Sequence, residues 1–394
     1  MERCYDVAIA GGGVIGSAVA YFLAAEAAFD GSVVVVERDP SYESCATTRS
    51  WGGIRQQFST PENVRMSLFG ADFVKRAAAL LSVEGAAPDL GFRERGYLFL
   101  AREAGLATLE RNGRLQRSLG AKVAVLPPDA LKRRFSWLEV GDLAGGALGL
   151  ENEGWFDPSA LLHGLRRKAR ALGAVYLTDE VVGIGLRRGR VESLRLRAGG
   201  RLGCRVLVNA AGPQAGRLAR LAGAALPVCP RKRTTFVFDC KPTFPDMPLI
   251  IDISGVAVRP EGAHYIAIVS PPEDRDRDAD DLDLEPEYAL FDEVIWPALA
   301  HRVPAFEAIK LTGAWAGHYD YNTFDRNAIL GRHPEIEGLL FCNGFSGHGL
   351  QQAPAAGRAI AELIVFGAYR SLDLANLSYA RVLEGRPVRE TNVV

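Results

Sequence analysis

The sequence has little of three features, and each shortage excludes a class of protein. The six cysteines of this 394-residue chain never approach C-x-x-C spacing, so we expect reduced thiols, with no metal site and no disulfide framework. No apolar run reaches the roughly 18 residues that a membrane-spanning helix needs. Neither sign of charge is in excess, and a net charge of −1 argues against a nucleic-acid partner.

The start of the chain leaves little room for a targeting segment. The first expected strand begins about five residues from Met1, so we expect no signal or transit peptide. We therefore expect a soluble, cytoplasmic protein without an integral membrane segment. Its length is sufficient for two lobes with sizeable cores.

A glycine motif between a strand and a helix stands near the start of the chain. Residues 7–10 are a short apolar run typical of a buried parallel strand, and residues 14–27 predict a helix. Gly11, Gly13 and Gly16 between them follow the G-x-G-x-x-G spacing. This spacing permits a tight turn, close approach of a pyrophosphate to the backbone, and packing of the helix on the strand. The motif predicts a nucleotide cofactor whose phosphates face the helix N-terminus.

A second strand and an acidic residue follow at the expected distance. Residues 32–36 (SVVVV) predict the strand, and Glu37 ends it. Such folds hydrogen-bond the adenosine ribose about 20 residues past the last glycine, which is the place of Glu37. Because strand, glycines, helix, strand and acid agree, we prefer a nucleotide site to a glycine turn without a ligand.

The order of the expected elements predicts an α/β chain (α+β overall) with two lobes. Residues 97–126 leave the first lobe through a strand, a helix and another strand, and a glycine-rich loop near residue 145 leads back. Residues 226–269 alternate with period 2 between Pro and Gly, which indicates an antiparallel sheet in the second lobe. We assign residues 1–90, 145–225 and 318–394 to a discontinuous Rossmann-like lobe, and residues 91–144 and 226–317 to a second, mainly antiparallel β-sheet lobe.

The remaining elements are expected from their flanking signals. Asp157, followed by Pro158, is expected to cap a helix over residues 160–171. The acidic run 273–287 is expected to be a solvated loop and not a binding site. The other expected elements are helices over residues 62–79, 103–120 and 287–300, and strands over residues 174–177, 181–186, 204–209 and 311–319.

Two further stretches contain residues suited to a site. In the polar connection after the second strand, Thr47, Thr48, Arg49 and Ser50 offer hydroxyl groups and a guanidinium that could face a cofactor. Arg55 follows in the same connection, and the residues alone leave open whether it lies at the surface or in a site.

The second stretch repeats the strand, glycine turn and helix near the end of the chain. Residues 339–342 predict the strand, residues 343–349 (NGFSGHG) the turn, and residues 350–364 the helix, with Pro354 expected in its first turn. A second helix N-terminus aimed at a site stabilises a developing anion. His348 in this turn is either a site residue or a capping and packing residue.

Paired glycine turns at the two ends of the chain favour FAD over NAD, and the whole chain resembles the FAD-dependent D-amino-acid oxidase superfamily, in its sarcosine and dimethylglycine oxidase branch. The matching segments are GGGVIG (11–16), Glu37–Arg38, SWGGIR (50–55), NAAGP (209–213) and GFSGHG (344–349). This resemblance implies an FAD-binding Rossmann-like domain, a β-sheet substrate domain and a flavoprotein oxidoreductase.

The resemblance also implies the site residues. Arg55 would hold a substrate carboxylate, Tyr319 would lie at the flavin and the substrate, and His348 and Gln351 would complete the catalytic group. The implied FAD contacts are Gly11, Gly13, Val14, Ile15, Gly16, Glu37, Arg38, Thr48, Arg49, Ser50, Val181, Ala211, Gly212, Gly344, Ser346, Gly347, His348, Gly349 and Leu350.

Three departures from the family pattern modify this expectation. Relatives with covalent flavin have a cysteine two residues before the position of Tyr319, where this chain has Gly317, so we expect non-covalent FAD. Oxidases of the branch place a lysine where this chain has Gln351. They also activate oxygen with a lysine of the second lobe, and no lysine occurs between Lys241 and Lys310.

Three functions remain open from the sequence. The first is oxidation of an amino acid or N-methyl amino acid (a sarcosine- or dimethylglycine-like amine) by hydride transfer to FAD, as a dehydrogenase more than an efficient oxidase. The second is a 2-hydroxy acid dehydrogenase, since a fold does not fix a substrate. The third is a respiratory-complex assembly factor with structural FAD, which would have a partner subunit. The electron acceptor, oxygen or a quinone-linked carrier, also remains open.

Overall fold

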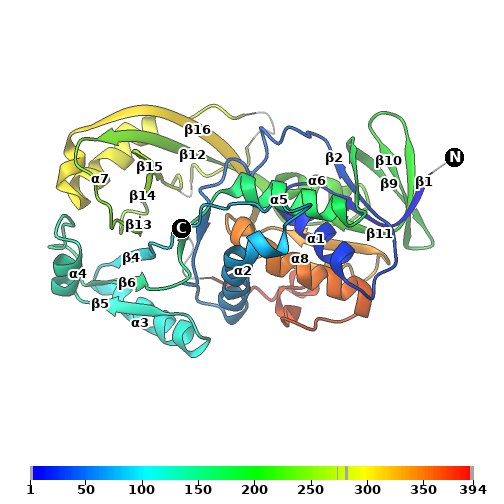
Figure 1. Ribbon diagram of the computed structural model, residues 1–394, viewed down its shortest axis with the longest axis horizontal. Coiled ribbons are helices and arrows are strands. Elements are labelled where there is room, and N and C mark those ends of the chain that lie inside the picture. Colours follow the sequence, from blue (N-terminus) through cyan, green and yellow to red (C-terminus); the bar gives the residue numbers. More distant parts are fainter. Residues whose placement is uncertain (1–2, 273, 280–282, 391–394) are drawn as a thin grey trace.

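The computed structural model describes residues 3–272, 274–279 and 283–390. Within these residues, two eight-stranded sheets form the centres of two lobes (Figure 1). The first sheet has the order β17-β18-β11-β1-β2-β8, and β10 and β9 extend it from β11. Its strands are β1 (Arg3–Ala10), β2 (Val33–Glu37), β8 (Val175–Thr178), β9 (Val181–Arg187), β10 (Arg190–Leu196), β11 (Arg201–Asn209), β17 (Ile329–Arg332) and β18 (Leu339–Asn343).

The centre of the first sheet is parallel, as its short apolar strands predict. β1 lies between β2 and β11, and its register pairs Ala10 with Asn209. Because these two strands end side by side, the turn after β1 and the turn after β11 meet at one edge of the sheet. That edge is where open α/β sheets bind their ligands.

The second sheet is mainly antiparallel, as the period-2 pattern predicts, and β13 pairs with β4 in parallel. Its order is β16-β12-β15-β14-β13-β4-β6-β5. Its strands are β4 (Tyr97–Ala101), β5 (Val123–Leu126), β6 (Gly145–Gly149), β12 (Val228–Cys240), β13 (Leu249–Ile251), β14 (Ala257–Glu261), β15 (His264–Ile268) and β16 (Ile309–Asn322), while β3 (Gly53–Ile54) and β7 (Gly154–Trp155) pair separately.

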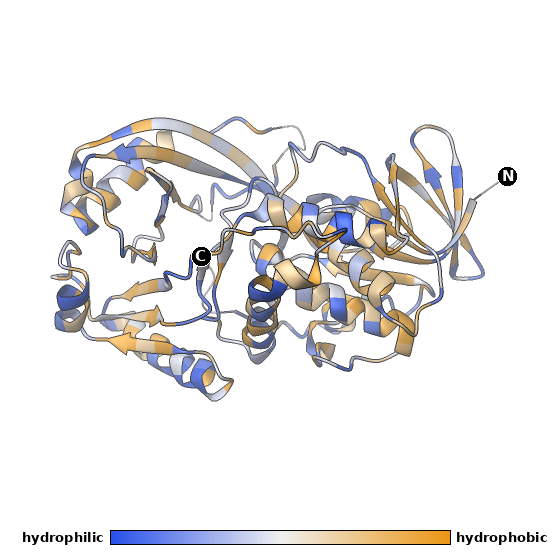
Figure 2. Cartoon of the chain, viewed as in Figure 1, coloured by the Kyte–Doolittle hydropathy of each residue, from blue (hydrophilic) through white to orange (hydrophobic). Residues whose placement is uncertain are grey.

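Helices cover both sheets, and hydrophobic residues concentrate in the strands and in the central helices of the first lobe (Figure 2). A Cβ on Gly357 of α8 would lie 2.7 Å from backbone and side-chain atoms of Ala18 in α1, so these two helices touch closely. No helix among the described residues is long and apolar enough to cross a membrane. The helices are α1 (Val14–Ala25), α2 (Pro61–Leu80), α3 (Glu103–Ser118), α4 (Pro128–Arg134), α5 (Pro158–Ala171), α6 (Ala215–Arg220), α7 (Trp296–Arg302), α8 (Gly349–Phe366) and α9 (Ala380–Leu383).

The structure confirms the predicted helix cap and the predicted bounds of two strands. The side chain of Asp157 accepts hydrogen bonds from the amides of Ser159 and Ala160, which caps α5. The strands expected over residues 97–101 and 123–126 have those bounds in β4 and β5.

Three local predictions are wrong. The expected glycine-rich loop near residue 145 is strand β6, which pairs with both β4 and β5, so we propose that residues 145–149 belong to the second lobe. The helix expected from residue 287 contains a π-helical segment, Phe291–Ile295, before α7. α8 begins at Gly349, one residue earlier than expected, which places Pro354 inside the helix beyond its first turn.

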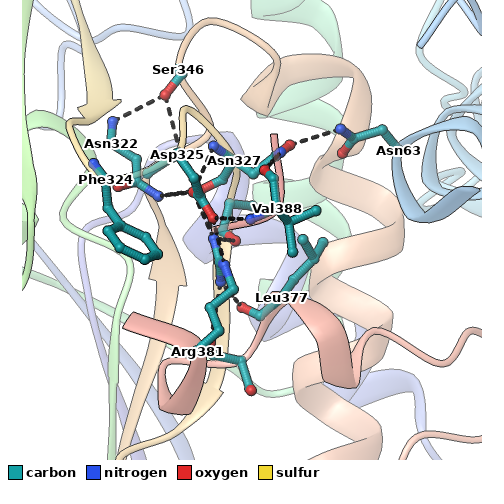
Figure 3. Close-up of polar contacts among 12 residues, drawn as sticks. Asn63, Asn322, Phe324, Asp325, Asn327, Ser346, Leu377, Arg381 and Val388 are labelled. Atoms are coloured by element: carbon teal, nitrogen blue, oxygen red, sulfur yellow. Dashed lines mark hydrogen bonds and ion pairs between the residues drawn. The ribbon is translucent and has the colours of Figure 1, made fainter. Parts of the chain in front are cut away.

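A buried ion pair connects the C-terminal segment to the first lobe (Figure 3). Arg381 donates from Nε to Oδ2 of Asp325 at 2.8 Å and from Nη2 to Oδ1 at 3.0 Å, and both side chains are almost fully buried. Asp325 also accepts a hydrogen bond from Asn322, whose backbone amide donates to the hydroxyl of Ser346. The ion pair is therefore linked to the turn that precedes α8.

We expect Arg381→Met to lower the free energy of unfolding by about 3–5 kcal/mol, because it leaves the Asp325 carboxylate buried without its cation. Denaturant unfolding of the full chain measures this change. Arg386→Met is the matched control, since Arg386 pairs with Glu384 at the surface, where such a pair contributes about 0–1 kcal/mol. Equal losses in the two variants would contradict the structural role of the buried pair.

Candidate functional site

A continuous cavity extends from the end of β2, past the turns after β1 and β11, to the second sheet. It brings together residues that are far apart in the sequence. The sequence-predicted residues that line it are Gly11, Gly13, Val14, Ile15, Glu37, Arg38, Arg49, Ser50, Arg55, Ala211, Gly212, Tyr319, Ser346, Gly347, His348, Gly349, Leu350 and Gln351.

The first glycine turn is shaped by contacts that exclude side chains. A Cβ on Gly11 would lie 2.3 Å from the carbonyl oxygen of Ala210, and a Cβ on Gly16 would lie 1.9 Å from that of Gly11. At Gly13, by contrast, the nearest atom to a Cβ is Sγ of Cys45 at 3.4 Å. Gly11 and Gly16 are thus required by the fold, whereas the space at Gly13 is available to a ligand at the N-terminus of α1.

Glu37 lies at the end of β2 and lines the cavity, and its role as a ribose ligand stays a prediction. Its Oε2 accepts a hydrogen bond from the amide of Gly12 at 2.6 Å, and its Oε1 accepts one from the amide of Asp39 at 2.9 Å. These bonds fix the carboxylate at the end of β2, where it lines the cavity.

Four of the expected cofactor contacts do not line the cavity. Gly16 packs the helix on the turn, Gly344 donates its amide to Asp320, and Val181 is buried at the start of β9. The hydroxyl of Thr48 donates to backbone carbonyls of its own loop. The neighbouring Thr47 lines the cavity and accepts a hydrogen bond from the amide of Val14 at 3.1 Å, so we propose Thr47 in place of Thr48.

The second glycine turn, which follows β18 of the first sheet, is held by β16, a strand of the second sheet. Oδ2 of Asp320, in β16, accepts hydrogen bonds from the amides of Gly344 at 2.6 Å and Phe345 at 3.1 Å. Burial raises the pKa of Asp320 to about 6. Gly344, Ser346 and Gly347 all have positive φ, which turns the chain so that the N-terminus of α8 faces the cavity. Helix geometry leaves its first amides without intrahelical acceptors, so they can face an anion.

Arg55 lines the cavity and is buried, with 3% of its surface exposed. Its Cζ lies 4.4 Å from the ring centroid of Phe58 and 4.9 Å from that of Phe99, close enough for cation–π attraction. Nη2 lies 3.0 Å from Nε2 of His348, and Nη1 donates to the carbonyl of Gln57 at 3.3 Å. The burial and these contacts show that Arg55 lies in the cavity and not at the surface.

His348 acts on Arg55 as a neutral acceptor. Burial, and then the charge of Arg55, lower the pKa of His348 to about 3. At neutral pH the imidazole is therefore uncharged, and its Nε2 accepts a hydrogen bond from Nη2 of Arg55. His348 orients Arg55 and is not suited to carry a proton near neutral pH.

Gln351 and Tyr319 complete the sequence-predicted group. Oε1 of Gln351 accepts a hydrogen bond from the backbone amide of Arg55 at 2.8 Å, so its side chain holds the segment that carries the guanidinium. The ring centroid of Tyr319 lies 4.8 Å from Cζ of Arg233. Burial raises the pKa of Tyr319 to about 12, so its phenol keeps its proton.

The acidic run 273–287 is not simply a solvated loop, which corrects the prediction. Asp276 forms two hydrogen bonds with Arg233, at 2.6 and 2.8 Å, and only 12% of its side chain is exposed. Lys232 pairs with Asp283 at 2.6 Å. The basic residues of β12 thus hold the acidic segment beside the cavity, which Arg233 lines. Residues 273 and 280–282 of the run lie outside the described residues.

The sequence analysis also missed Tyr97 and Glu153. Tyr97 begins β4, and Glu153 lies between β6 and β7. A Cβ on Gly53 would lie 1.9 Å from the hydroxyl of Tyr97, so a residue of β4 reaches the segment that precedes Arg55. Glu153 accepts hydrogen bonds from the amide of Gln56 at 2.7 Å and from Nε2 of Gln57 at 2.8 Å. No local motif marks either residue, because their roles depend on contacts between distant segments.

The chemistry of the cavity fits FAD better than a metal. The part of the chain that the structure describes contains no cluster of His, Cys, Asp and Glu that could hold a metal ion. Two helix N-termini, the space at Gly13 and the carboxylate of Glu37 are the features that an elongated dinucleotide requires.

Comparisons with known proteins agree with this chemistry. A family model described as FAD dependent oxidoreductase matches residues 6–363. The FAD-dependent oxidoreductase domain-containing protein 1 of Xenopus laevis is 42% identical over 425 residues, covering 99% of this chain and 85% of that protein. The glycine oxidase of Geobacillus kaustophilus (strain HTA426) is 27% identical over 374 residues, covering 92% of this chain and 94% of that protein.

A solved structure supports the fold independently. The L-proline dehydrogenase from P. horikoshii superposes with a TM-score of 0.84 at 24% identity, covering 98% of this chain and 100% of that chain. This likeness confirms the mixed α/β fold with a Rossmann-like domain and a second β-sheet domain.

We expect Gly13→Val to abolish FAD binding, because the added side chain occupies the space at the N-terminus of α1, and to leave the fold intact, because no protein atom lies closer than 3.4 Å to the new Cβ. Flavin absorbance per chain measures binding, and circular dichroism measures the fold. Gly16→Val is the contrasting variant, since its side chain strikes the carbonyl of Gly11 and should also destabilise the apoprotein. Stoichiometric FAD in the Gly13 variant would contradict this assignment.

Glu153 predicts a pH dependence of stability. Burial raises its pKa from 4.5 to about 7, so between these values the folded protein holds a proton that the unfolded chain has released. Its contribution to stability therefore falls as pH rises from about 4.5 to 7. Because glutamine does not titrate, we expect the free energy of unfolding of Glu153→Gln to rise by about 3 kcal/mol relative to that of the parent protein as pH increases over this interval.

Unfolding free energies of both proteins at pH 5 and pH 8 test this expectation. Glu151→Gln, which alters an exposed carboxylate two residues away, is the matched control. A difference between parent and Glu153→Gln that does not change with pH would show that Glu153 does not titrate in this range.

Proposed function

The chain belongs to the FAD-dependent oxidoreductase family, and from this premise we propose that it oxidises an amino acid or N-methyl amino acid by hydride transfer to non-covalent FAD. The observation that carries the proposal is a buried guanidinium, Arg55, in the cavity that also contains both glycine turns. The similarity to a glycine oxidase, and to sarcosine dehydrogenases at 26% identity, favours an amine over a 2-hydroxy acid.

In this proposal the first lobe holds the cofactor. The turn at Gly11–Gly16 with Thr47 would contact the pyrophosphate, Glu37 the ribose, and the turn at Gly344–Gly349 the flavin. When bound, FAD supplies the acceptor for a hydride from the carbon next to the substrate nitrogen. The N-terminus of α8 favours negative charge on whatever lies against it.

The residues around Arg55 would orient the substrate. A guanidinium binds a carboxylate through two parallel hydrogen bonds, which fixes direction as well as position. His348 and Gln351 hold the guanidinium and its backbone, while Phe58 and Phe99 limit its movement. Tyr319, which stays protonated, can donate a hydrogen bond to the substrate. The oxidised amine is an imine, which water hydrolyses.

We further propose that the protein is a dehydrogenase more than an oxidase. Among the described residues that line the cavity there is no lysine, and Lys232 on β12 is paired with Asp283 and Glu287. A cation that could stabilise reduced oxygen would have to come from an arginine. Because Arg55 is assigned to the substrate carboxylate and Arg233 is paired with Asp276, we propose a quinone or protein carrier as the electron acceptor.

The experiment that tests the proposed reaction is anaerobic reduction of the flavin. FAD-loaded protein is mixed with glycine, sarcosine, larger amino acids and their N-methyl forms, and 2-hydroxy acids, and bleaching of the flavin absorbance is followed. Reduction by the amines supports the proposal, and reduction by hydroxy acids alone replaces it with the second function. An absence of reduction by every compound would favour a non-enzymatic role.

We expect Arg55→Met to reduce kcat/KM for the amine about 30- to 1000-fold, equivalent to about 2–4 kcal/mol, because it removes a charge-assisted contact that orients the substrate. Methionine still fills the space between Phe58 and Phe99, so FAD content and the unfolding midpoint should not change. Normal turnover with full FAD content would place the carboxylate elsewhere.

We expect the reduced protein to react slowly with oxygen and faster with a quinone analogue, because no lysine is found among the described residues that line the cavity. Anaerobically reduced protein is mixed with either acceptor in a stopped-flow instrument, and the return of flavin absorbance is recorded. Faster reoxidation by oxygen than by any artificial acceptor would contradict the dehydrogenase assignment.

A further inference from the structure

One wall of the cavity is formed by a continuous row of residues across the second sheet. Thr235 of β12 pairs with Ile268, Ile268 pairs with Ala257, and Ala257 pairs with Ile251. All four of these residues line the cavity. Ile251 in turn pairs with Phe99, whose ring contacts the guanidinium of Arg55. The row therefore begins beside Arg55 and leads away from it.

This wall is aliphatic where the middle strands of the sheet form it. The residues that β13, β14 and β15 contribute to the lining are Leu249, Ile251, Ala257 and Ile268. The alternate residues of these strands, such as Ile250 and Val258, point to the other face and belong to a separate buried cluster. The sheet is thus apolar on both faces, and a ligand in the cavity would cover part of one of them.

The charged side chains nearest this wall lie at the two ends of the row and on β14, where the buried Arg259 does not line the cavity, donates to the carbonyl of Trp51 at 2.6 Å and pairs with Glu261. Arg55 lies beside Phe99, and Arg233, beyond Thr235, is neutralised by its two hydrogen bonds with Asp276. Among the lining residues, Glu37 and Asp39 lie at the end of β2, and Asp320 holds the turn before α8. The aliphatic wall therefore offers nothing to a second charged group on a ligand.

We propose that the substrate is an amino acid or N-substituted amino acid with an apolar side chain, and that Ala257 sets the size of that side chain; this rests on the amine oxidation proposed above. The carboxylate binds at Arg55, and the side chain lies along the wall. Ala257 is the smallest member of the row and lies between two isoleucines, so a larger side chain at this position would take up space along the wall.

Unreactive carboxylates test the wall without requiring turnover. Acetate, butanoate, 4-methylpentanoate and succinate are titrated into the FAD-loaded full chain, and the perturbation of the flavin spectrum gives each Kd. We expect affinity to rise about fourfold for each methylene that the wall buries, and succinate to bind more weakly than butanoate. Equal affinities along the series, tighter binding of succinate, or no saturable change with any carboxylate would overturn the proposal.

Two variants at one position test the role of Ala257. We expect Ala257→Leu to weaken 4-methylpentanoate at least about tenfold and acetate less than twofold, because only the longer ligand reaches the filled space. Ala257→Gly is the matched control and should keep the preference for long chains. Equal weakening of both ligands by Ala257→Leu, with FAD retained, would overturn the assignment of this residue.

Flavin reduction separates the failure of this inference from the failure of the proposed reaction. Faster reduction by leucine or N-methylleucine than by glycine or sarcosine supports both. Faster reduction by glycine, sarcosine or glutamate leaves the amine oxidation standing and overturns the apolar substrate. If no amine reduces the flavin but affinity still rises with chain length, the apolar wall stands and the amine oxidation fails.

Discussion

The structure depends on one close contact between two strand ends. Gly11 follows β1 and lies against the carbonyl of Ala210, which follows β11. The contact is so close that it leaves no room for a side chain at Gly11. This contact brings two turns of small residues to one edge of the parallel sheet. The N-terminus of α1 and the cavity lie at this edge, outside the carboxyl ends of the parallel strands.

Buried polar groups, which are expensive unless paired, hold the rest of the site in place. Asp320 reaches from β16 of the second sheet to the backbone of the turn before α8, and the pair of Asp325 with Arg381 supports the same turn through Asn322. Because β18 of the first sheet leads into the turn and β16 of the second sheet supplies its acceptor, these hydrogen bonds connect the two sheets beside the N-terminus of α8.

Much of the fold could be predicted from the sequence because its signals are local. The glycine spacing, the short apolar strands and the cap at Asp157 each depend on a few neighbouring residues, and the structure contains all of them. The errors concern pairings between distant segments. The glycine-rich residues 145–149 have the local pattern of a loop, but they form a strand because they pair with β4 and β5. Asp276 has the local pattern of a solvated residue, but it is held by Arg233. Tyr97 and Glu153 carry no local signal, so only the tertiary structure could bring them to Arg55.

The central claim is that Arg55 places a carboxylate in the same cavity as the flavin. The most direct test is a crystal structure of the FAD-loaded protein with a bound, unreactive carboxylate. The account predicts both carboxylate oxygens within hydrogen-bond distance of the Arg55 guanidinium and the flavin ring against the turn at Ser346–Gly349. A carboxylate bound elsewhere, with Arg55 still enclosed by His348, Phe58 and Phe99, would contradict it.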